Sequence, residues 1–95
     1  MKTYRRLLRI EQRFIDNGEP RKRGECPYAL AITEMFGEPF VVMFRYAYSV
    51  RCVIGKRAAI LIDLSHPSTV RINAYDCGKG MVPHTARIAV EERGS

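Results

Sequence analysis

The sequence predicts one α+β domain: a small, mostly antiparallel sheet with one buried central helix and a second, C-terminal helix packed on it. Its 95 residues are the size of one domain. Short β runs with turn signals alternate with two segments that carry helix start and stop residues. Four Phe and five Tyr supply enough apolar surface to argue against a disordered chain.

The first segment, residues 3–16, fits either a helix or a strand. Apolar residues recur near helical spacing, but Leu8 and Ile10 also alternate with charged neighbours, as in a strand. Arg5 and Arg9 share a face in both cases, because a separation of four suits both periods. Residues 17–24 follow as a flexible basic loop, since Gly18, Pro20 and Gly24 interrupt any regular pattern.

The next segment is typical of a helix. Pro27 stands at the first helical position after Cys26, and Gly37 closes the segment. The residues between them are apolar on nearly all sides, which predicts the central buried helix. Its members are Tyr28, Ala29, Leu30, Ala31, Ile32, Thr33, Glu34, Met35 and Phe36.

Three β runs follow at Phe40–Arg45, Val50–Ile54 and Arg57–Ile62, the last two joined by a predicted hairpin turn at Gly55-Lys56. A second helix is predicted from a cap at Ser65 to about Cys77, before Gly78. Val70, Ala74 and Cys77 share one side of it.

A last strand is predicted at His84–Val90, with Ala86, Ile88 and Val90 facing inward and Arg87 and Ala89 outward. Residues 91–95 are expected to fray. The alternation of hairpins and helices predicts that the helices pack on one face of the sheet.

The charge is basic and uneven. Sixteen Lys and Arg face ten Asp and Glu, and residues 1–25 hold eight of the basic groups against four acidic ones. The candidate binding face is therefore placed in this N-terminal segment and loop, where it would attract phosphates or an acidic protein surface. Its members are Arg5, Arg9, Arg13, Arg21, Lys22 and Arg23, with aromatic contacts from Tyr4, Tyr46 and Tyr48.

Several functional classes are disfavoured. The longest apolar stretches have five residues, far short of the roughly 20 that a membrane span needs. The start of the chain leads into no long apolar region, so no secretory signal is expected. Three widely spaced cysteines predict reduced, buried thiols and a cytoplasmic setting.

Chemical sites have simpler interpretations in packing. Zinc ligands could come from Cys26, Cys52, Cys77, His66 and His84, but no two stand at the spacing of structural zinc sites. Cys26 at a helix start lacks a base placed nearby, and residues 77–80 lack the spacing of a phosphate-binding loop. Asp63 and Asp76 fit caps or turns better than a catalytic pair. We expect no enzyme, metal or cofactor.

Three short blocks, Phe14–Gly18, Cys26–Ala31 and Ala74–Gly78, resemble the "HIDxG", "CPxALA" and "AFDxG" patterns of one family. This family consists of small proteins carried by bacteriophages and mobile elements, especially of actinobacteria. The resemblance spans roughly residues 8–90, with departures at Phe14 (His in the family), Gly80 (Pro) and residues 84–86 (Phe-Thr-Phe). It implies a phage-type accessory protein without an assigned activity, and a first strand running into a helical turn at Gln12–Asn17.

Two functions remain open. A protein that binds and modulates a host protein with an acidic surface would use its arginines and exposed Tyr28, Tyr46 and Tyr48 as interface anchors. A sequence-independent nucleic-acid binder would use the six basic residues on phosphates and the tyrosines on bases. A structural or virion accessory role is the further alternative.

Overall fold

The computed structural model describes residues 2–22, 24–37, 39–45, 50–55 and 60–92, with the backbone alone at 41–45 and 50–55. Five strands form one sheet in the order β1-β5-β4-β3-β2, and every neighbouring pair is antiparallel. The predicted α+β class is confirmed. The elements are β1 (Lys2–Ile10), α1 (Gln12–Asn17), α2 (Pro27–Phe36), β2 (Phe40–Arg45), β3 (Val50–Gly55), β4 (Ile60–Leu64), α3 (His66–Asp76) and β5 (His84–Glu92).

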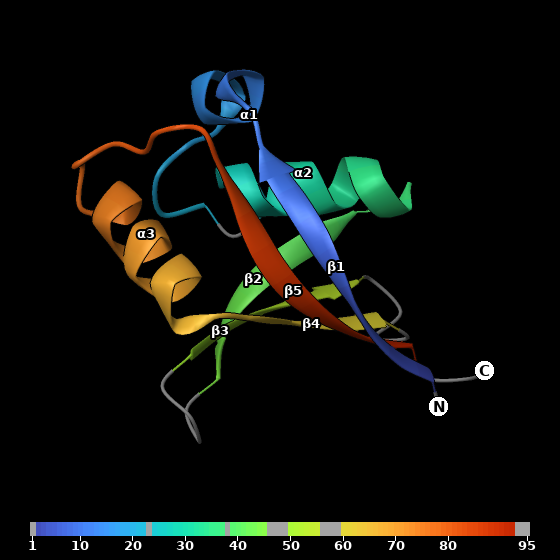
Figure 1. Cartoon of the computed structure of the whole chain (residues 1–95). Helices are drawn as coiled ribbons and strands as arrows, with labels where there is room; N and C mark the ends of the chain where they lie inside the picture. Colours follow the sequence, from blue (N-terminus) through green and yellow to red (C-terminus); the bar gives the residue numbers. More distant parts are fainter. Residues whose placement is uncertain (1, 23, 38, 46–49, 56–59, 93–95) are drawn as a thin grey trace.

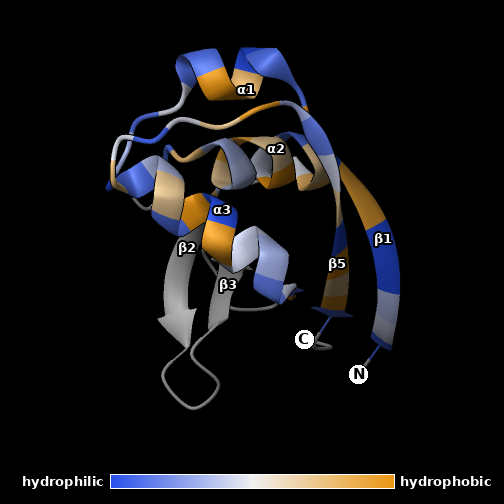
Figure 2. Ribbon diagram, turned by 60° about the vertical axis from the view of Figure 1, so that its left-hand side comes forward, coloured by the Kyte–Doolittle hydropathy of each residue, from blue (hydrophilic) through white to orange (hydrophobic). Residues whose placement is uncertain are grey.

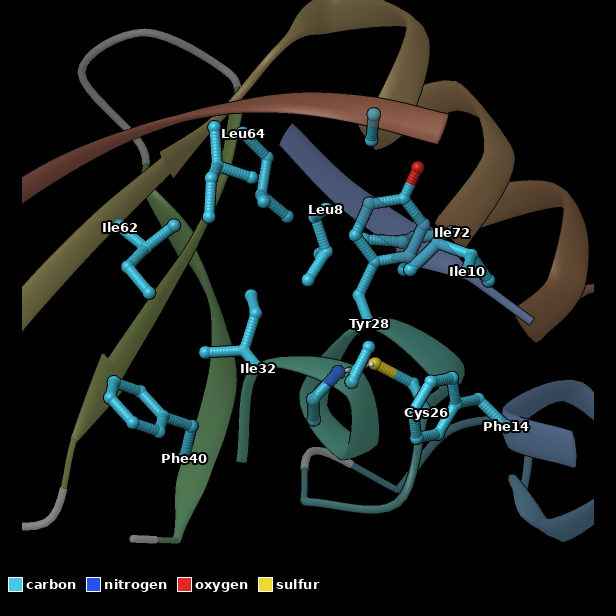
Figure 3. Close-up of a cluster of buried hydrophobic side chains, with 14 of the residues drawn as sticks. Leu8, Ile10, Phe14, Cys26, Tyr28, Ile32, Phe40, Ile62, Leu64 and Ile72 are labelled. Atoms are coloured by element: carbon cyan, nitrogen blue, oxygen red, sulfur yellow. Dashed lines mark hydrogen bonds between the residues drawn. The ribbon is translucent and has the colours of Figure 1, made fainter. Parts of the chain in front are cut away.

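α2 and α3 pack on one face of the sheet, and α1 lies against α2 beyond the end of β1 (Figure 1). Phe14 of α1, Ile32 of α2 and Ile72 of α3 belong to one core with the inward side chains of the strands. Figure 3 shows these side chains converging between the sheet and α2. The opposite face of the sheet, which we call the open face, carries none of the described helices. The inward strand residues of this core are Leu8, Ile10, Phe40, Ile62, Leu64, Ala86, Ile88 and Val90.

The first segment is a strand that runs directly into a short helix. Leu8 and Ile10 are buried, whereas Arg5, Leu7 and Arg9 are exposed, so the period is two rather than 3.6. Burial of alternate residues against α2 decides between the two structures that the sequence allows. The helical turn at Gln12–Asn17 lies where the family resemblance places it.

The central helix begins and ends as predicted. The Cys26 Sγ accepts a hydrogen bond from the Ala29 backbone N–H at 3.4 Å, and Pro27 occupies the first turn. Gly37 has a φ of 73°, and its N–H donates to the Thr33 carbonyl at 2.9 Å. A left-handed residue that returns a hydrogen bond to the last turn is a common helix end. Tyr28, Ala29 and Ile32 are fully buried, which confirms the central position of this helix.

The second long helix also has the predicted cap, since the Ser65 hydroxyl accepts from the Ser68 N–H at 3.4 Å. Its buried side, however, is formed by Ser68, Thr69, Ile72 and Tyr75. The side that carries Val70 and Cys77 faces outward, with Val70 52% exposed. Apolar character alone did not locate the buried side of this helix, because Ser68 is buried against a polar partner, the hydroxyl of Tyr28.

The remaining strands differ from prediction mainly at their ends. β2 has the predicted bounds and β3 gains Gly55, but the third run, predicted at 57–62, is observed at Ile60–Leu64. The predicted turn residue Lys56 and residues 57–59 lie outside the described part of the chain. β5 continues to Glu92, so the prediction of a frayed tail is wrong for residues 91 and 92. Thr3 pairs with Glu91, and Lys2 pairs with Glu92.

Candidate binding surface

The predicted basic cluster is divided between two sides of the molecule. Arg5 and Arg9 lie on β1 and project from the open face of the sheet, as their spacing predicts. Arg13, Arg21 and Lys22 lie instead on α1 and the following loop, on the helical side. Arg23 is outside the described residues. The expectation of a single face containing all six residues is therefore wrong.

Acidic neighbours inside the protein neutralise two of these residues. The Arg13 guanidinium lies 2.7 Å from a Glu34 carboxylate oxygen and 3.0 Å from one of Glu11. The Lys22 ammonium lies 2.6 Å from Glu19 and 3.5 Å from Glu25, and the hydrogen bond to Glu19 raises the pKa of Lys22. A charge already paired in this way attracts an external anion less strongly.

Arg21 has a structural role in holding the loop against α3. Its backbone N–H donates to the Asp76 carboxylate at 2.9 Å, and its Nε–H donates to the Asp76 carbonyl at 3.1 Å. The backbone of Arg21 has a φ of 66°, which is uncommon for a residue other than glycine. The Asp76 carboxylate thus contacts a loop 55 residues away in the sequence, and Asp63 lies on β4, beyond the other end of α3.

Arg87 joins Arg5 and Arg9 on the open face. It stands opposite Leu7 in the β1–β5 register, and Leu7 is 65% exposed. Among the described residues, none of these three arginines forms an ion pair with a carboxylate. We call Arg5, Leu7, Arg9 and Arg87 the arginine–leucine patch. The outward position of Arg87 was predicted, but its place beside Leu7 follows from strand pairing, which spans 80 residues of sequence.

Two shallow hollows adjoin this patch. Both are lined by Ala89, Arg5 and Asp63. Their volumes are about 380 and 220 Å³. Asp63 and Glu91 add negative charge at this end of the open face, and each already interacts within the protein. The positive charge is therefore concentrated toward Arg9 and Arg87.

Of the tyrosines predicted as contacts, the two that the structure describes do not lie on the open face with the arginines. Tyr4 packs against the core, and its hydroxyl donates to Glu92 at 2.7 Å, a hydrogen bond that raises the pKa of Tyr4. Tyr28, expected as an exposed interface anchor, is completely buried, because it fills the space between α2, α3 and β5. Tyr46 and Tyr48 lie outside the described residues.

A buried hydrogen-bonded chain connects α2, α3 and β5. The Tyr28 hydroxyl lies 3.1 Å from the Ser68 Oγ and 2.6 Å from the His84 Nε2, and Ser68 contacts the Ser65 Oγ at 3.0 Å. The His84 Nδ1 faces the Val82 carbonyl at 2.7 Å, so that nitrogen carries a proton. Burial raises the pKa of Tyr28. Tyr28 and Ser68 are inaccessible to solvent. These hydrogen bonds therefore serve to hold α2, α3 and β5 together.

The cysteines have different environments. Cys26 is 2% exposed, and its sulfur caps α2, which leaves it no access to a substrate. Cys77 is exposed, so the prediction of a buried thiol is wrong there; it follows the last turn of α3, beyond the core. The Cys52 side chain lies outside the described part. Within the described residues, no three His, Cys, Asp or Glu side chains are grouped to hold a metal ion.

No described helix has the length and apolar character to cross a membrane. Comparisons with protein-family models, curated proteins and solved structures found no match to this chain.

Proposed function

We propose that this chain is a non-enzymatic accessory protein that binds and modulates another protein through the arginine–leucine patch. The observation that carries the proposal is the exposed Leu7 side chain, surrounded on the open face by three arginines that have no described carboxylate partner. The partner surface would be acidic, to complement these arginines, and would offer an apolar group to Leu7.

The composition of the patch favours a protein partner. Arginine is enriched in interface cores and hot spots because its guanidinium makes several hydrogen bonds and also packs against flat surfaces. An exposed leucine gains free energy when a partner removes it from water, by an amount on the order of 1–2 kcal/mol. The hollows at Ala89 would accept a protruding partner side chain next to this apolar centre.

Nucleic-acid binding is the second candidate, and the three arginines on the open face favour it. Two features make it weaker than the sequence suggests. Arg13 and Lys22 are paired with carboxylates, which leaves fewer groups for phosphates. The described residues of the open face include no aromatic ring, and stacking on aromatic side chains is the usual means of holding single-stranded bases.

The resemblance to phage-borne accessory proteins supplies the proposed setting. In that setting the partner is a host protein, and the site of action is the host cytoplasm. An interface of standard size buries about 800 Å² on each partner, so the arginine–leucine patch would be the centre of a larger contact surface on the host protein.

Quantitative capture from a bacterial host lysate tests the proposal. The immobilised wild-type chain is compared with Leu7→Asp, which lowers the net charge by one in the centre of the patch, and with Lys79→Glu, which lowers it by two on the α3–β5 connection. We expect specific acidic proteins to be retained by the wild type and by Lys79→Glu and to be lost with Leu7→Asp. Identical capture by all three would contradict the proposal.

Fluorescence anisotropy with a generic duplex and a single-stranded oligonucleotide distinguishes nucleic-acid binding from protein binding. Three phosphate contacts on a duplex give a slope of about −2.7 in a plot of log K against log salt, and six give about −5.4. If protein binding is the function, we expect weak oligonucleotide binding at 50 mM salt that is indifferent to Leu7→Asp. Tight binding with the steeper slope would favour nucleic acid.

A further inference from the structure

β1 is one edge of the sheet. It pairs with β5 on its inner side, and no other described strand pairs with its outer side (Figure 2). Consecutive N–H groups of a strand point to opposite sides, so every second residue of β1 directs its backbone donor and acceptor outward. No backbone hydrogen bond to another described segment satisfies these groups. Such an edge is a template for one more strand.

The side chains along this edge are strongly cationic. Lys2, Arg5, Arg6 and Arg9 are all exposed, and β1 has no acidic residue. Arg5 and Arg9 project from the open face, and Lys2 and Arg6 have the opposite parity, so both sides of the edge are positive. Among the described residues, none of these four cations is ion-paired with a carboxylate.

The positions of these charges disfavour a second copy as the added strand. Antiparallel pairing through the outer edges of two copies places odd-numbered residues opposite odd-numbered ones and even opposite even, because opposite residues direct their N–H and C=O groups either both toward or both away from the partner. Full overlap of the two β1 strands then places Arg6 opposite Arg6, and a shift by two residues places Arg5 opposite Arg5. Like charges directly opposite each other are destabilising, and β1 has no acidic residue to offset them.

We propose that an extended acidic segment of the partner protein adds to β1 as a sixth strand. Carboxylates on such a segment lie opposite the cations that a second copy would meet, and the outward N–H and C=O groups of β1 complete an antiparallel or parallel ladder. This proposal rests on the proposed function, because it specifies how the same partner contacts β1. The arginine–leucine patch then contacts the remainder of the partner.

Protection of the sheet from aggregation is the common role of charge on an edge strand. That role requires only that copies repel one another, and it is fulfilled by the same four cations. It does not require that the outer backbone groups remain accessible or that Leu7 be exposed beside them. The accessible edge and the adjacent apolar side chain together point to a ligand of opposite charge.

Amide hydrogen exchange, measured residue by residue by NMR at 50 mM salt, tests the proposal. The probe is a nine-residue peptide in which glutamate alternates with valine, and the control peptide has lysine in place of glutamate. We expect the acidic peptide to slow exchange at alternate residues of β1, which exchange rapidly in the free protein. The lysine peptide should leave β1 unchanged.

Matched variants test the charge contribution. Arg6→Glu is expected to lower the affinity for the acidic peptide about tenfold, because one attractive cross-strand pair becomes repulsive. Lys79→Glu changes the net charge equally but lies on the α3–β5 connection, so it should change affinity less than about twofold. Equal effects of the two variants would show that only net charge matters and would overturn the edge proposal.

The outcomes separate this proposal from the proposed function. Peptide binding without alternate-residue protection of β1 overturns strand addition, while a loss of capture with Leu7→Asp would still support the patch. Protection of β1 combined with capture that is indifferent to Leu7→Asp overturns the patch and retains the edge. Concentration-dependent dimers with the same β1 protection in the absence of peptide would identify a second copy as the occupant and contradict the proposal.

Discussion

Tyr28 shows how one polar atom determines the packing of a whole helix. Its ring fills the core between α2 and β5, and its hydroxyl lies within hydrogen-bonding distance of Ser68 and His84 (Figure 3 shows it pointing away from α2). A buried hydroxyl without a partner costs about 1–3 kcal/mol. The serine side of α3 therefore faces inward in place of Val70. Hydrophobic pattern could not predict this, because the partner of Tyr28 is 40 residues away.

Replacing Tyr28 by Phe tests the energetic role of this hydroxyl. We expect the free energy of unfolding to fall by about 1–2 kcal/mol, because Ser68 and His84 each lose a buried partner. Tyr75→Phe is the matched control, since its hydroxyl makes one long hydrogen bond, 3.4 Å, to the Ile15 carbonyl. Urea unfolding of the three proteins measures the difference. Equal losses for the two variants would contradict the assigned role of Tyr28.

The difference in stability between the wild type and Tyr28→Phe is expected to depend on pH. Burial raises the pKa of Tyr28 in the folded state, so the unfolded chain releases its proton first. This contribution to stability is complete below the unfolded pKa, about 10, and is lost as pH rises through the folded pKa. The stability advantage of the wild type over Tyr28→Phe should therefore narrow above pH 10. An advantage that stays constant from pH 8 to 11 would argue against the burial of the hydroxyl.

The thiols should differ in reactivity. Cys77 is exposed and should be alkylated rapidly by iodoacetamide in the folded protein, whereas Cys26 should react only when the protein unfolds. Mass spectrometry of digested protein after brief labelling, with and without urea, measures each site separately. Rapid labelling of Cys26 without denaturant would show that the start of α2 is not enclosed.

At the scale of elements, the sequence predicted more of the local structure than of the pairing. Pro27 and Gly37 mark α2 because each requires or permits one backbone conformation, independent of distant contacts. The identity of β1 depended on what covers Leu8 and Ile10, so its local pattern fitted two structures. Arg87 was predicted to point outward, but only the pairing of the first strand with the last brings it beside Leu7.

The end of α2 provides a test at this scale. Gly37→Ala should destabilise the protein by about 1 kcal/mol, because a Cβ disfavours the left-handed backbone conformation observed there, although no neighbouring atom obstructs it. Gly37→Asn should cost less, since asparagine adopts this conformation more readily. Thermal or urea unfolding measures both. If Ala and Asn cost the same, the backbone conformation at Gly37 does not limit stability.

At the scale of the whole molecule, net charge was a poor guide to where positive charge is available. The first quarter of the chain holds half of the basic residues, but Arg13 and Lys22 are paired with glutamates. Arg87, from the other end of the chain, joins Arg5 and Arg9 on the open face. Local sequence predicted the pair on β1, whereas the ion pairs and the third arginine depend on tertiary contacts.

A partner bound as proposed contacts the open face and β1, not the helical side. NMR mapping of the ¹⁵N-labelled protein, titrated with an acidic partner recovered by capture, measures this directly. We predict that the largest shifts occur at amides of β1 and β5 around Leu7 and Arg87. Shifts confined to α1, α2 and α3, with β1 and β5 unchanged, would contradict the account.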